Sequence, residues 1–495
     1  MTESIHREMP LTIVVIGASG DLSQRKILPA LFALACRSLI PEPFRVVGFA
    51  RTAMTHGEFR ARAMENLTCR YTPKSDCGAK MDRFLERCFY FAGQYDSTDS
   101  LLDLHRFLRE LERTPISRRM YYMATPPDVF TSVVQSIGDA GMATCDAGGD
   151  CWSRIVVEKP FGRDRESSDS LVKVMARVFP EEQTYRIDHY LGKDVVQNLM
   201  VLRFANTIFE PVWNRRYVHS VHILWSEEIG IGSRGRYFDA YGIIRDVIQN
   251  HLMQVLALTA MEPPARLDST SVRDAKVRLL RSIPPLCAAD ILTGQYRGVE
   301  HDGRHMPDYL AETHVPPGSR TPTFAAVRLK VNNPRWQGVP FVIVAGKAMN
   351  QWRNEIVVRF KPLDNNLFCD VAPCLESNEL RIRIQPDEAL VLRITNKVPD
   401  LGMRLAVTNL DLRYSDAFDI EIPGAYESLL LDVIRGDRSL FIRADELEAA
   451  WNVYTPALHE LDEQQIKPQL YDFGSSGPAT VESFIRGNES AAAPA

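Results

Sequence analysis

A buried strand followed directly by a glycine-rich turn is the feature that most restricts how this chain can fold. Leu11–Ile16 is short and consists of β-branched or apolar residues throughout, as expected for a strand buried on both faces of a parallel sheet. The turn that follows reads Gly17-Ala18-Ser19-Gly20-Asp21-Leu22-Ser23, and a helical stretch runs on from about Leu22 to Cys36. This order of strand, turn and helix is typical of a doubly wound α/β sheet.

The turn has the composition of a dinucleotide phosphate site. Gly17 permits a tight turn, and the small residues Ala18 to Gly20 let backbone N–H groups approach a pyrophosphate at the helix N-terminus. Ser19 and Leu22 stand where the strict Gly-x-Gly-x-x-Gly pattern has its second and third glycines. An ordinary structural turn is therefore the alternative interpretation.

The end of the second predicted strand, Arg45–Phe49, favours NADP over NAD. An acidic residue at this place accepts the 2′-hydroxyl of NAD, whereas Arg51 and Thr52 can hold a 2′-phosphate through charge-assisted hydrogen bonds. Lys26, one helical turn into the first helix, is a further candidate phosphate contact. The alternative for Arg51 is a solvated surface arginine.

The remaining patterns predict two domains and a tail. Further strands are expected at Tyr90–Gln94, Met120–Met123 and Arg154–Val157, which completes a Rossmann-type domain over residues 1–195. A mostly antiparallel sheet is expected from strand-like runs at Phe324–Val331, Val339–Ala345, Glu355–Phe360, Glu379–Gln385 and Ala389–Thr395. Helices are expected at Arg245–Met261, Tyr426–Gly436 and Ala444–Glu460, giving a second, β+α domain over residues 196–485 and a disordered tail over 486–495.

Composition excludes several classes of function. The net charge is −5 and no basic stripe with aromatic residues is present, which argues against a nucleic-acid-binding protein. No apolar run approaches the roughly 18 residues that span a bilayer, so no membrane partner is expected. The nine cysteines include no Cys-x-x-Cys pair, so we expect no metal site and scattered reduced thiols. The N-terminus carries no apolar signal segment, which indicates a cytoplasmic location, with organellar import left open.

Two segments carry candidate chemistry. Lys159, in Glu158-Lys159-Pro160-Phe161-Gly162, follows a buried strand and should point into the crevice where ligands bind. Asp188-His189-Tyr190-Leu191-Gly192-Lys193 offers one carboxylate and three donors suited to phosphate. Neighbours in an extended segment face opposite sides, so these side chains can share a site only if the chain turns. A polar loop without function is the alternative.

His251 is the candidate base. It follows Asp246 by five residues, and if the run is helical the two lie on neighbouring faces. A histidine on an apolar helix is otherwise a satisfied core residue.

Together these motifs identify a resemblance to glucose-6-phosphate dehydrogenase, which extends from about Leu11 to Gly477. Two further stretches resemble this family, Gln197–Phe204 and Ile244–His251. The Asp188–Lys193 segment is highly specific to the family, whereas Glu158-Lys159-Pro160 also occurs in other sugar oxidoreductases.

The resemblance implies a reaction and a role for each candidate residue. Hydride would pass from C1 of β-glucose 6-phosphate to NADP, giving 6-phosphogluconolactone, the first step of the oxidative pentose phosphate pathway. His251 would be the general base and Asp188 the carboxylate that orients it. The implied cofactor-binding residues are Gly17, Ala18, Ser19, Gly20, Asp21, Leu22, Lys26, Arg51, Thr52, Pro126 and Lys159. The implied substrate-binding residues are Lys159, His189, Tyr190, Lys193, Glu227, Asp246, Lys347 and Gln385.

The resemblance also implies an assembly and leaves alternatives open. The large sheet would build a homodimer, or a homotetramer. Val391, Ser476 and Trp352 depart from the pattern of a second, structural NADP site, so that site is expected to be absent or weak. The remaining alternatives are a dehydrogenase of broader hexose-phosphate specificity and a non-catalytic NADP-binding sensor.

Overall fold

The computed structural model describes residues 9–114, 117–144, 150–301, 304–372, 375–418 and 420–489. These residues form two compact units. The first unit comprises residues 1–192 with Arg266–Arg273 and Glu421–Glu448, and the second comprises the rest of the chain. The two later segments of the first unit lie within the range 196–485 that the sequence assigned to a second domain.

The first unit is built on a seven-stranded sheet of order β17-β6-β5-β4-β1-β2-β3. Its strands are β1 Leu11–Ile16, β2 Phe44–Ala50, β3 Cys88–Ala92, β4 Arg118–Met123, β5 Trp152–Glu158, β6 Thr184–Ile187 and β17 Phe441–Ile442. All neighbouring pairs are parallel except β17 with β6, which confirms the doubly wound sheet.

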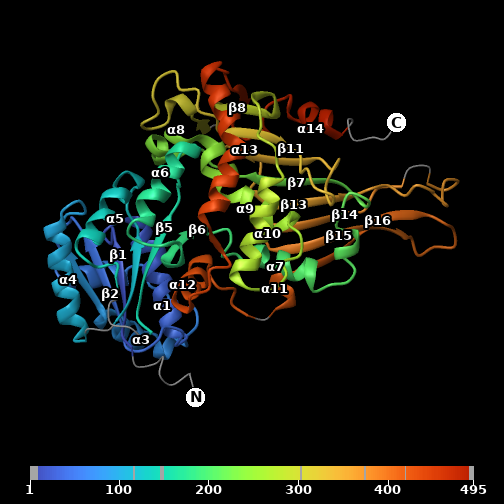
Figure 1. The fold of residues 1–495 in the computed structure, drawn as a ribbon. Helices are drawn as coiled ribbons and strands as arrows, with labels where there is room; N and C mark the ends of the chain where they lie inside the picture. Colours follow the sequence, from blue (N-terminus) through green and yellow to red (C-terminus); the bar gives the residue numbers. More distant parts are fainter. Residues whose placement is uncertain are drawn as a thin grey trace. The chain divides into compact units, whose positions relative to one another are not determined.

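Helices cover both faces of this sheet (Figure 1). They are α1 Leu28–Cys36, α2 His56–Met64, α3 Lys74–Glu86, α4 Thr98–Glu112, α5 Phe130–Asp139, α6 Arg165–Ala176 and α12 Ala425–Arg435. Helix α12 packs against α1 although nearly the whole second unit separates them in the sequence. The first unit is therefore completed by a segment from late in the chain.

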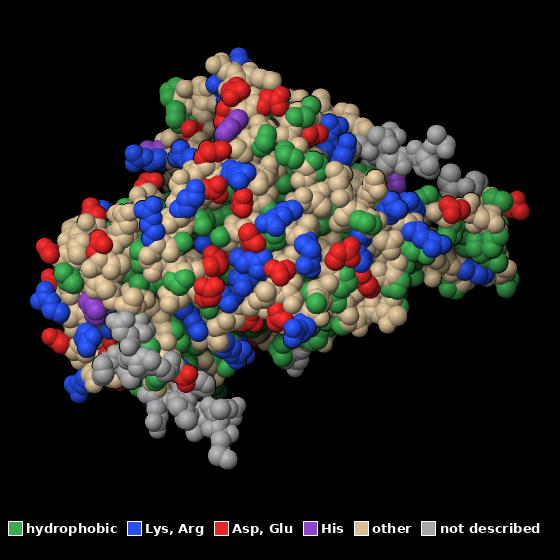
Figure 2. Space-filling view, viewed as in Figure 1, with side chains coloured by type: hydrophobic (Ala, Val, Ile, Leu, Met, Phe, Trp, Pro, Cys, Tyr) green, Lys and Arg blue, Asp and Glu red, His purple; other side chains and the backbone are tan. Residues whose placement is uncertain are grey.

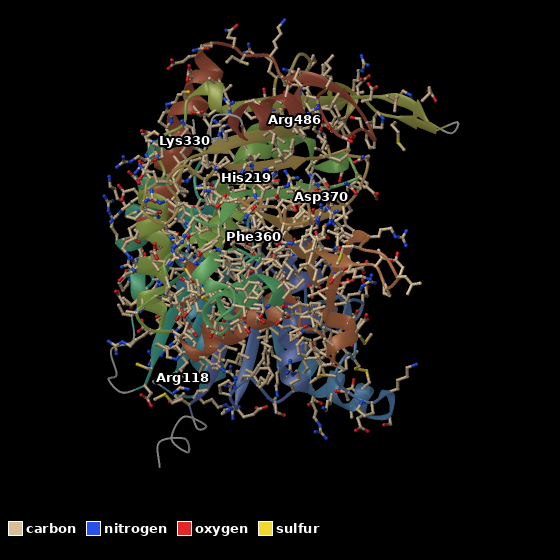
Figure 3. The ribbon with its side chains drawn as sticks, turned by 90° about the vertical axis from the view of Figure 1, so that its right-hand side faces the viewer. Arg118, His219, Lys330, Phe360, Asp370 and Arg486 are labelled. Carbon is tan, nitrogen blue, oxygen red and sulfur yellow. A yellow bond between two sulfur atoms is a disulfide. The ribbon has the colours of Figure 1, made fainter. Side chains whose placement is uncertain are left out.

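The second unit contains a nine-stranded sheet of order β16-β15-β14-β13-β7-β12-β11-β8-β18. Its strands are β7 Val218–Ser226, β8 Ile291–Arg297, β11 Phe324–Leu329, β12 Phe341–Gly346, β13 Arg353–Phe360, β14 Glu379–Gln385, β15 Ala389–Lys397, β16 Leu405–Arg413 and β18 Gln469–Asp472. Only the β7–β12 and β8–β18 pairs are parallel, so the predicted antiparallel character is confirmed. Figure 3 labels His219 on β7 and Phe360 on the adjacent β13. A separate hairpin pairs β9 Val299–His301 with β10 Arg304–Met306.

The second unit contains several helices, one of which has an unexpected form. They are α7 Asp194–Phe204, α8 Gly235–Ile243, the π-helix η7 Ile244–Leu252, α9 Met253–Ala260, α11 Tyr414–Ala417 and α14 Val481–Glu489. Helices α10 Ser269–Arg281 and α13 Ala444–Glu463 begin in segments of the first unit and end in the second. The helix predicted at Arg245–Met261 is present, but its first half is π-helical. Among the described helices, none has both the length and the apolar character that crossing a membrane requires.

Two expectations are corrected by the structure. Residues 486–489, predicted to be part of a disordered tail, belong to α14, where the Phe484 ring lies 4.3 Å from the guanidinium of Arg328. Residues 490–495 lie outside the described part of the chain. Cys69 and Cys77, expected to be reduced, form a disulfide because the turn before α3 brings their Cα atoms to 5.8 Å.

Candidate active site

The glycine-rich loop is held between the ends of two strands of the first unit. The backbone N–H groups of Gly17 and Ala18 donate to the carbonyl of Phe49 at 2.8 and 3.3 Å. Gly17 has a φ of +92°, and a Cβ atom there would lie 2.4 Å from the carbonyl oxygen of Ala124. Only glycine fits this position. A helix begins directly after Gly20, and the N–H groups of its first turn have no acceptor within the helix, which suits an anionic phosphate.

The end of β2 lies beside this loop. The hydroxyl of Thr52 is 3.4 Å from that of Ser19, and the exposed Arg51 guanidinium lies 5.3 Å from the ring of Tyr95. Burial raises the pKa of the Tyr95 hydroxyl, against the effect of the nearby Arg51. Arg62 of α2 donates to the Ser19 carbonyl at 3.3 Å, so a second cation reaches the loop.

The other cofactor candidates also lie around this edge of the sheet. The N–H of Ala124 donates to the Ile16 carbonyl at 2.7 Å, so the exposed Pro126, two residues on, follows the strand next to β1. Lys26 is exposed on the π-helical turn Ser23–Ile27. Asp21 is exposed, with its carboxylate 3.9 Å from Arg25. Gly20 suits a dinucleotide phosphate, because the only described atom beyond its chain neighbours within 4 Å of a Cβ added there would be the Gly17 carbonyl oxygen, at 3.3 Å.

Lys159 follows a buried carboxyl group. Glu158 ends β5, and its side chain accepts a hydrogen bond of 2.5 Å from the hydroxyl of Tyr122 and another from Tyr426. Burial raises the pKa of Glu158, against the effect of both tyrosine hydrogen bonds. Lys159 itself is half-buried and is joined to Pro160 by a cis peptide bond.

The segment after β6 turns, so its side chains do not simply alternate between two faces. The buried Asp188 carboxylate accepts a hydrogen bond of 2.9 Å from the N–H of Tyr190, which closes the turn. The rings of His189 and Tyr190 lie 5.0 Å apart. The His189 ring also stacks on that of Tyr426, with centroids 6.4 Å apart and planes 7° from parallel. A Cβ atom on Gly192 would lie 2.4 Å from the Ala425 carbonyl oxygen, so this turn packs closely against α12.

In the second unit, the buried Lys347 forms an ion pair with the partly exposed Glu227. The Lys347 ammonium is 2.5 Å from the Glu227 carboxylate and only 1% of the residue is exposed. The rings of Trp225 and Phe238 lie 5.2 and 5.7 Å from the ammonium. Burial lowers the pKa of Lys347, although Glu227 acts in the opposite direction. The pair offers a donor and an acceptor to sugar hydroxyls in a low-dielectric environment.

The π-helix η7 contains both Asp246 and His251. Its hydrogen bonds join residues five apart, so these two residues are separated by about one turn of the helix. Both residues are buried, and 4% of His251 is exposed. The Asp246 carboxylate accepts a 3.2 Å hydrogen bond from the Tyr237 hydroxyl, and burial raises the pKa of that tyrosine.

The last two candidates of the second unit lie at the ends of elements. Lys193 is half-buried at the N-cap of α7. Gln385 ends β14, and its side-chain oxygen lies 3.5 Å from the Asn354 amide.

Sequence analysis did not find several residues that contact the candidates or Glu158, which precedes Lys159. They are Arg62, Tyr122, Tyr237, Asn354 and Tyr426. For Arg62, the Thr55–Glu58 capping box that starts α2 was a local signal, because it places Arg62 two turns into a helix after β2.

The fold and these residues define a dinucleotide-binding oxidoreductase. A parallel sheet presents a glycine-rich loop at its carboxyl edge, and buried acid, base and amine groups follow in both units. Residues 14–198 match the model of the glucose-6-phosphate dehydrogenase NAD-binding domain, and residues 200–491 match that of the glucose-6-phosphate dehydrogenase C-terminal domain. The chain therefore belongs to the glucose-6-phosphate dehydrogenase family, whose members are oxidoreductases acting on CH–OH groups.

Individual relatives agree with this assignment. The chain is 50% identical over 474 residues to glucose-6-phosphate 1-dehydrogenase 1, chloroplastic, of Arabidopsis thaliana. The aligned region covers 95% of this chain and 81% of the relative. It is 43% identical to glucose-6-phosphate 1-dehydrogenase of Dictyostelium discoideum, with 98% and 96% of the two chains covered. A solved glucose-6-phosphate dehydrogenase in complex with its substrate glucose 6-phosphate superposes with a TM-score of 0.89 at 39% identity, over 97% of each chain.

Proposed function

We propose that this chain oxidises β-D-glucose 6-phosphate to 6-phospho-D-glucono-1,5-lactone with NADP⁺ as hydride acceptor. The observation that supports this most strongly is the match of both parts of the chain, residues 14–198 and 200–491, to the two domain models of one family. The substrate named for the superposed structure is glucose 6-phosphate, which agrees with the proposal.

The proton transfer is assigned to His251. Its imidazole takes the proton of the C1 hydroxyl while the C1–H bond breaks and a C1=O bond forms, so that one proton and one hydride leave the sugar. NADP⁺, when bound, supplies the nicotinamide C4 that accepts this hydride. We assign to Asp188 the role of orienting His251 and stabilising its protonated form. The small exposure of His251 supports a base that works away from bulk water.

The other polar groups are assigned to binding. His189, Tyr190 and Lys193 would hold the substrate phosphate by charge-assisted hydrogen bonds. Lys159 would lie between sugar and cofactor. The second unit would contribute Glu227, Asp246, Lys347 and Gln385 as partners of the sugar, and the ion pair between Lys347 and Glu227 supports this assignment.

Replacing the base should abolish most of the turnover. His251→Ala should lower kcat by about 10²–10⁴-fold, because it removes general-base catalysis, while the Kd for NADP stays near that of the wild type. Steady-state rates and cofactor titration measure the two quantities. His219→Ala on β7, a half-buried histidine of the same unit, is the matched control and should leave kcat unchanged. Wild-type turnover in His251→Ala would remove His251 from the mechanism.

The preference for NADP is assigned to the cations near the glycine loop. Arg51 is exposed at the end of β2, and Arg62 reaches the same loop through Ser19. A guanidinium can bind a phosphate with two parallel hydrogen bonds, which a ribose hydroxyl does not offer. NADP is therefore the proposed cofactor, with NAD as the alternative.

Arg51→Ala should raise KM for NADP by about 10–100-fold, since a hydrogen bond to a charged group contributes about 1.5–3 kcal/mol. KM for NAD should change less than about twofold, because NAD has no 2′-phosphate. Rates with each cofactor at saturating sugar phosphate measure both values. The exposed Arg177→Ala serves as the control. Equal weakening of NADP and NAD by Arg51→Ala would refute the 2′-phosphate assignment.

We also propose a homodimer or homotetramer built through the nine-stranded sheet. Exposed apolar side chains on β16 and the turn before it, Leu401, Met403, Leu410 and Leu412, support this. Figure 2 shows apolar side chains at the end of the second unit toward which β15 and β16 extend in Figure 1. Sedimentation should give a multiple of the 56.0 kDa chain mass, and a monomer at micromolar concentration would contradict the proposal.

The proposed location is the cytoplasm, with an organelle as the alternative. The Arabidopsis relative is named chloroplastic, whereas the Dictyostelium name gives no location. Fractionation of the source cells decides between them, since activity confined to the organelle fraction would exclude the cytoplasm.

A further inference from the structure

The carboxyl group of Glu158 is buried in the first unit, and the reaction described above gives it no role. Two tyrosine hydroxyls, from Tyr122 and Tyr426, donate to it. Burial raises the pKa of both tyrosines, and the neighbouring Glu158 raises it further, so both hydroxyls stay protonated and act as donors. A buried carboxylate without such donors would be strongly destabilised.

The three side chains come from three separate parts of the chain. Tyr122 lies on β4 and Glu158 at the end of β5, which are neighbouring strands of the sheet. Tyr426 lies in the first turn of α12, in the late segment that belongs to this unit. Helix α12 is therefore fixed to the carboxyl edge of the sheet by a specific polar contact as well as by its packing on α1.

Glu158 and Tyr426 are each adjacent to a residue assigned to the substrate, Lys159 in the chain and His189 in space. Lys159 follows Glu158 directly in the chain, so the position of its backbone depends on how Glu158 is held. The ring of Tyr426 stacks on that of His189, while its hydroxyl bonds to Glu158. One tyrosine thus contacts both the residue before Lys159 and a residue assigned to the phosphate.

We infer that Glu158, Tyr122 and Tyr426 form a positioning cluster for the proposed reaction. The two hydroxyls fix Glu158 and through it Lys159, and the Tyr426 ring fixes the plane of His189. The inference rests on the roles proposed above for Lys159 and His189. None of the three residues needs to touch a reacting atom, because displacing a catalytic group by about 1 Å can by itself cost about 10²-fold in rate.

Tyr121 provides a matched control for a hydroxyl deletion. It precedes Tyr122 on β4 and is equally buried, but neighbouring strand residues point to opposite faces. Its hydroxyl donates to the Met142 carbonyl at 2.9 Å and not to Glu158. Tyr121→Phe and Tyr122→Phe therefore each delete one buried hydroxyl from the same strand, and the Tyr121 hydroxyl also contacts Arg119.

The experiment compares steady-state kinetics of Tyr121→Phe, Tyr122→Phe and Tyr426→Phe with glucose 6-phosphate and NADP. Tyr122→Phe and Tyr426→Phe should each lower kcat by about tenfold. Each removes one hydrogen bond to Glu158, and a tenfold change in rate corresponds to about 1.4 kcal/mol, the size of contribution that one such hydrogen bond makes to holding this side chain. Tyr121→Phe should change kcat less than about twofold, although its thermal unfolding midpoint should fall by about as much as that of Tyr122→Phe. The Tyr122→Phe/Tyr426→Phe double variant should lose less than the product of the single effects, since both act through Glu158.

A second pair of variants separates the ring from the hydroxyl. Tyr426→Leu removes the stack on His189 and should raise KM for glucose 6-phosphate at least tenfold, whereas Tyr426→Phe keeps the ring and should leave this KM within about threefold. KM for NADP should stay unchanged in both. If Tyr426 variants do not fold, Glu158→Gln, which keeps the shape of the side chain, should show the same loss of kcat as Tyr122→Phe.

The outcomes that would overturn the inference are distinct from failure of the proposed function. Equal effects of Tyr121→Phe and Tyr122→Phe on kcat, or wild-type kcat in Glu158→Gln, would reduce the cluster to a structural role. Absence of cofactor reduction by the wild-type protein with glucose 6-phosphate would instead refute the proposed function.

Discussion

The carboxyl ends of the parallel strands in the first unit meet at one edge of the sheet, and the nucleotide side of the proposed site depends on this. Ile16 pairs with Phe49 on one side and with Met123 on the other, and Met123 pairs with Val157. The glycine loop, Arg51 and Lys159 each follow the end of one of these strands within a few residues, so they start close to one line across the sheet. Because parallel pairing aligns these ends, residues from distant parts of the sequence need only follow their strands directly.

Buried charge is the second constraint. Glu158 and Lys347 are removed from water, and each is compensated by specific partners, the Tyr122 hydroxyl and the Glu227 carboxylate. Such groups are costly when left unpaired, so their partners hold them in narrowly defined positions. The same burial lowers the pKa of Lys347 and raises the pKa of Glu158, in each case by disfavouring the charged form.

Local sequence patterns predicted part of this structure and could not predict the rest. The strand Leu11–Ile16 was predicted to the residue because its apolar run is bounded by a proline and a glycine. The π-helical form of Ile244–Leu252 was not predicted, since apolar periodicity does not distinguish hydrogen bonding to the fourth residue from bonding to the fifth. Tyr426 was missed because its contacts are made across more than 230 residues of chain, with His189 and Glu158. The Cys69–Cys77 disulfide was missed because a spacing of eight residues is not diagnostic.

The initial rate of NADP reduction by glucose 6-phosphate, run beside NAD and beside unphosphorylated glucose, tests the central claim most directly. The proposed site predicts fast reduction only when NADP and the phosphorylated sugar are both present, since the 2′-phosphate and the sugar phosphate each have assigned cationic partners. Cofactor binding without reduction by any sugar phosphate would contradict the account and favour a sensor built on the same fold.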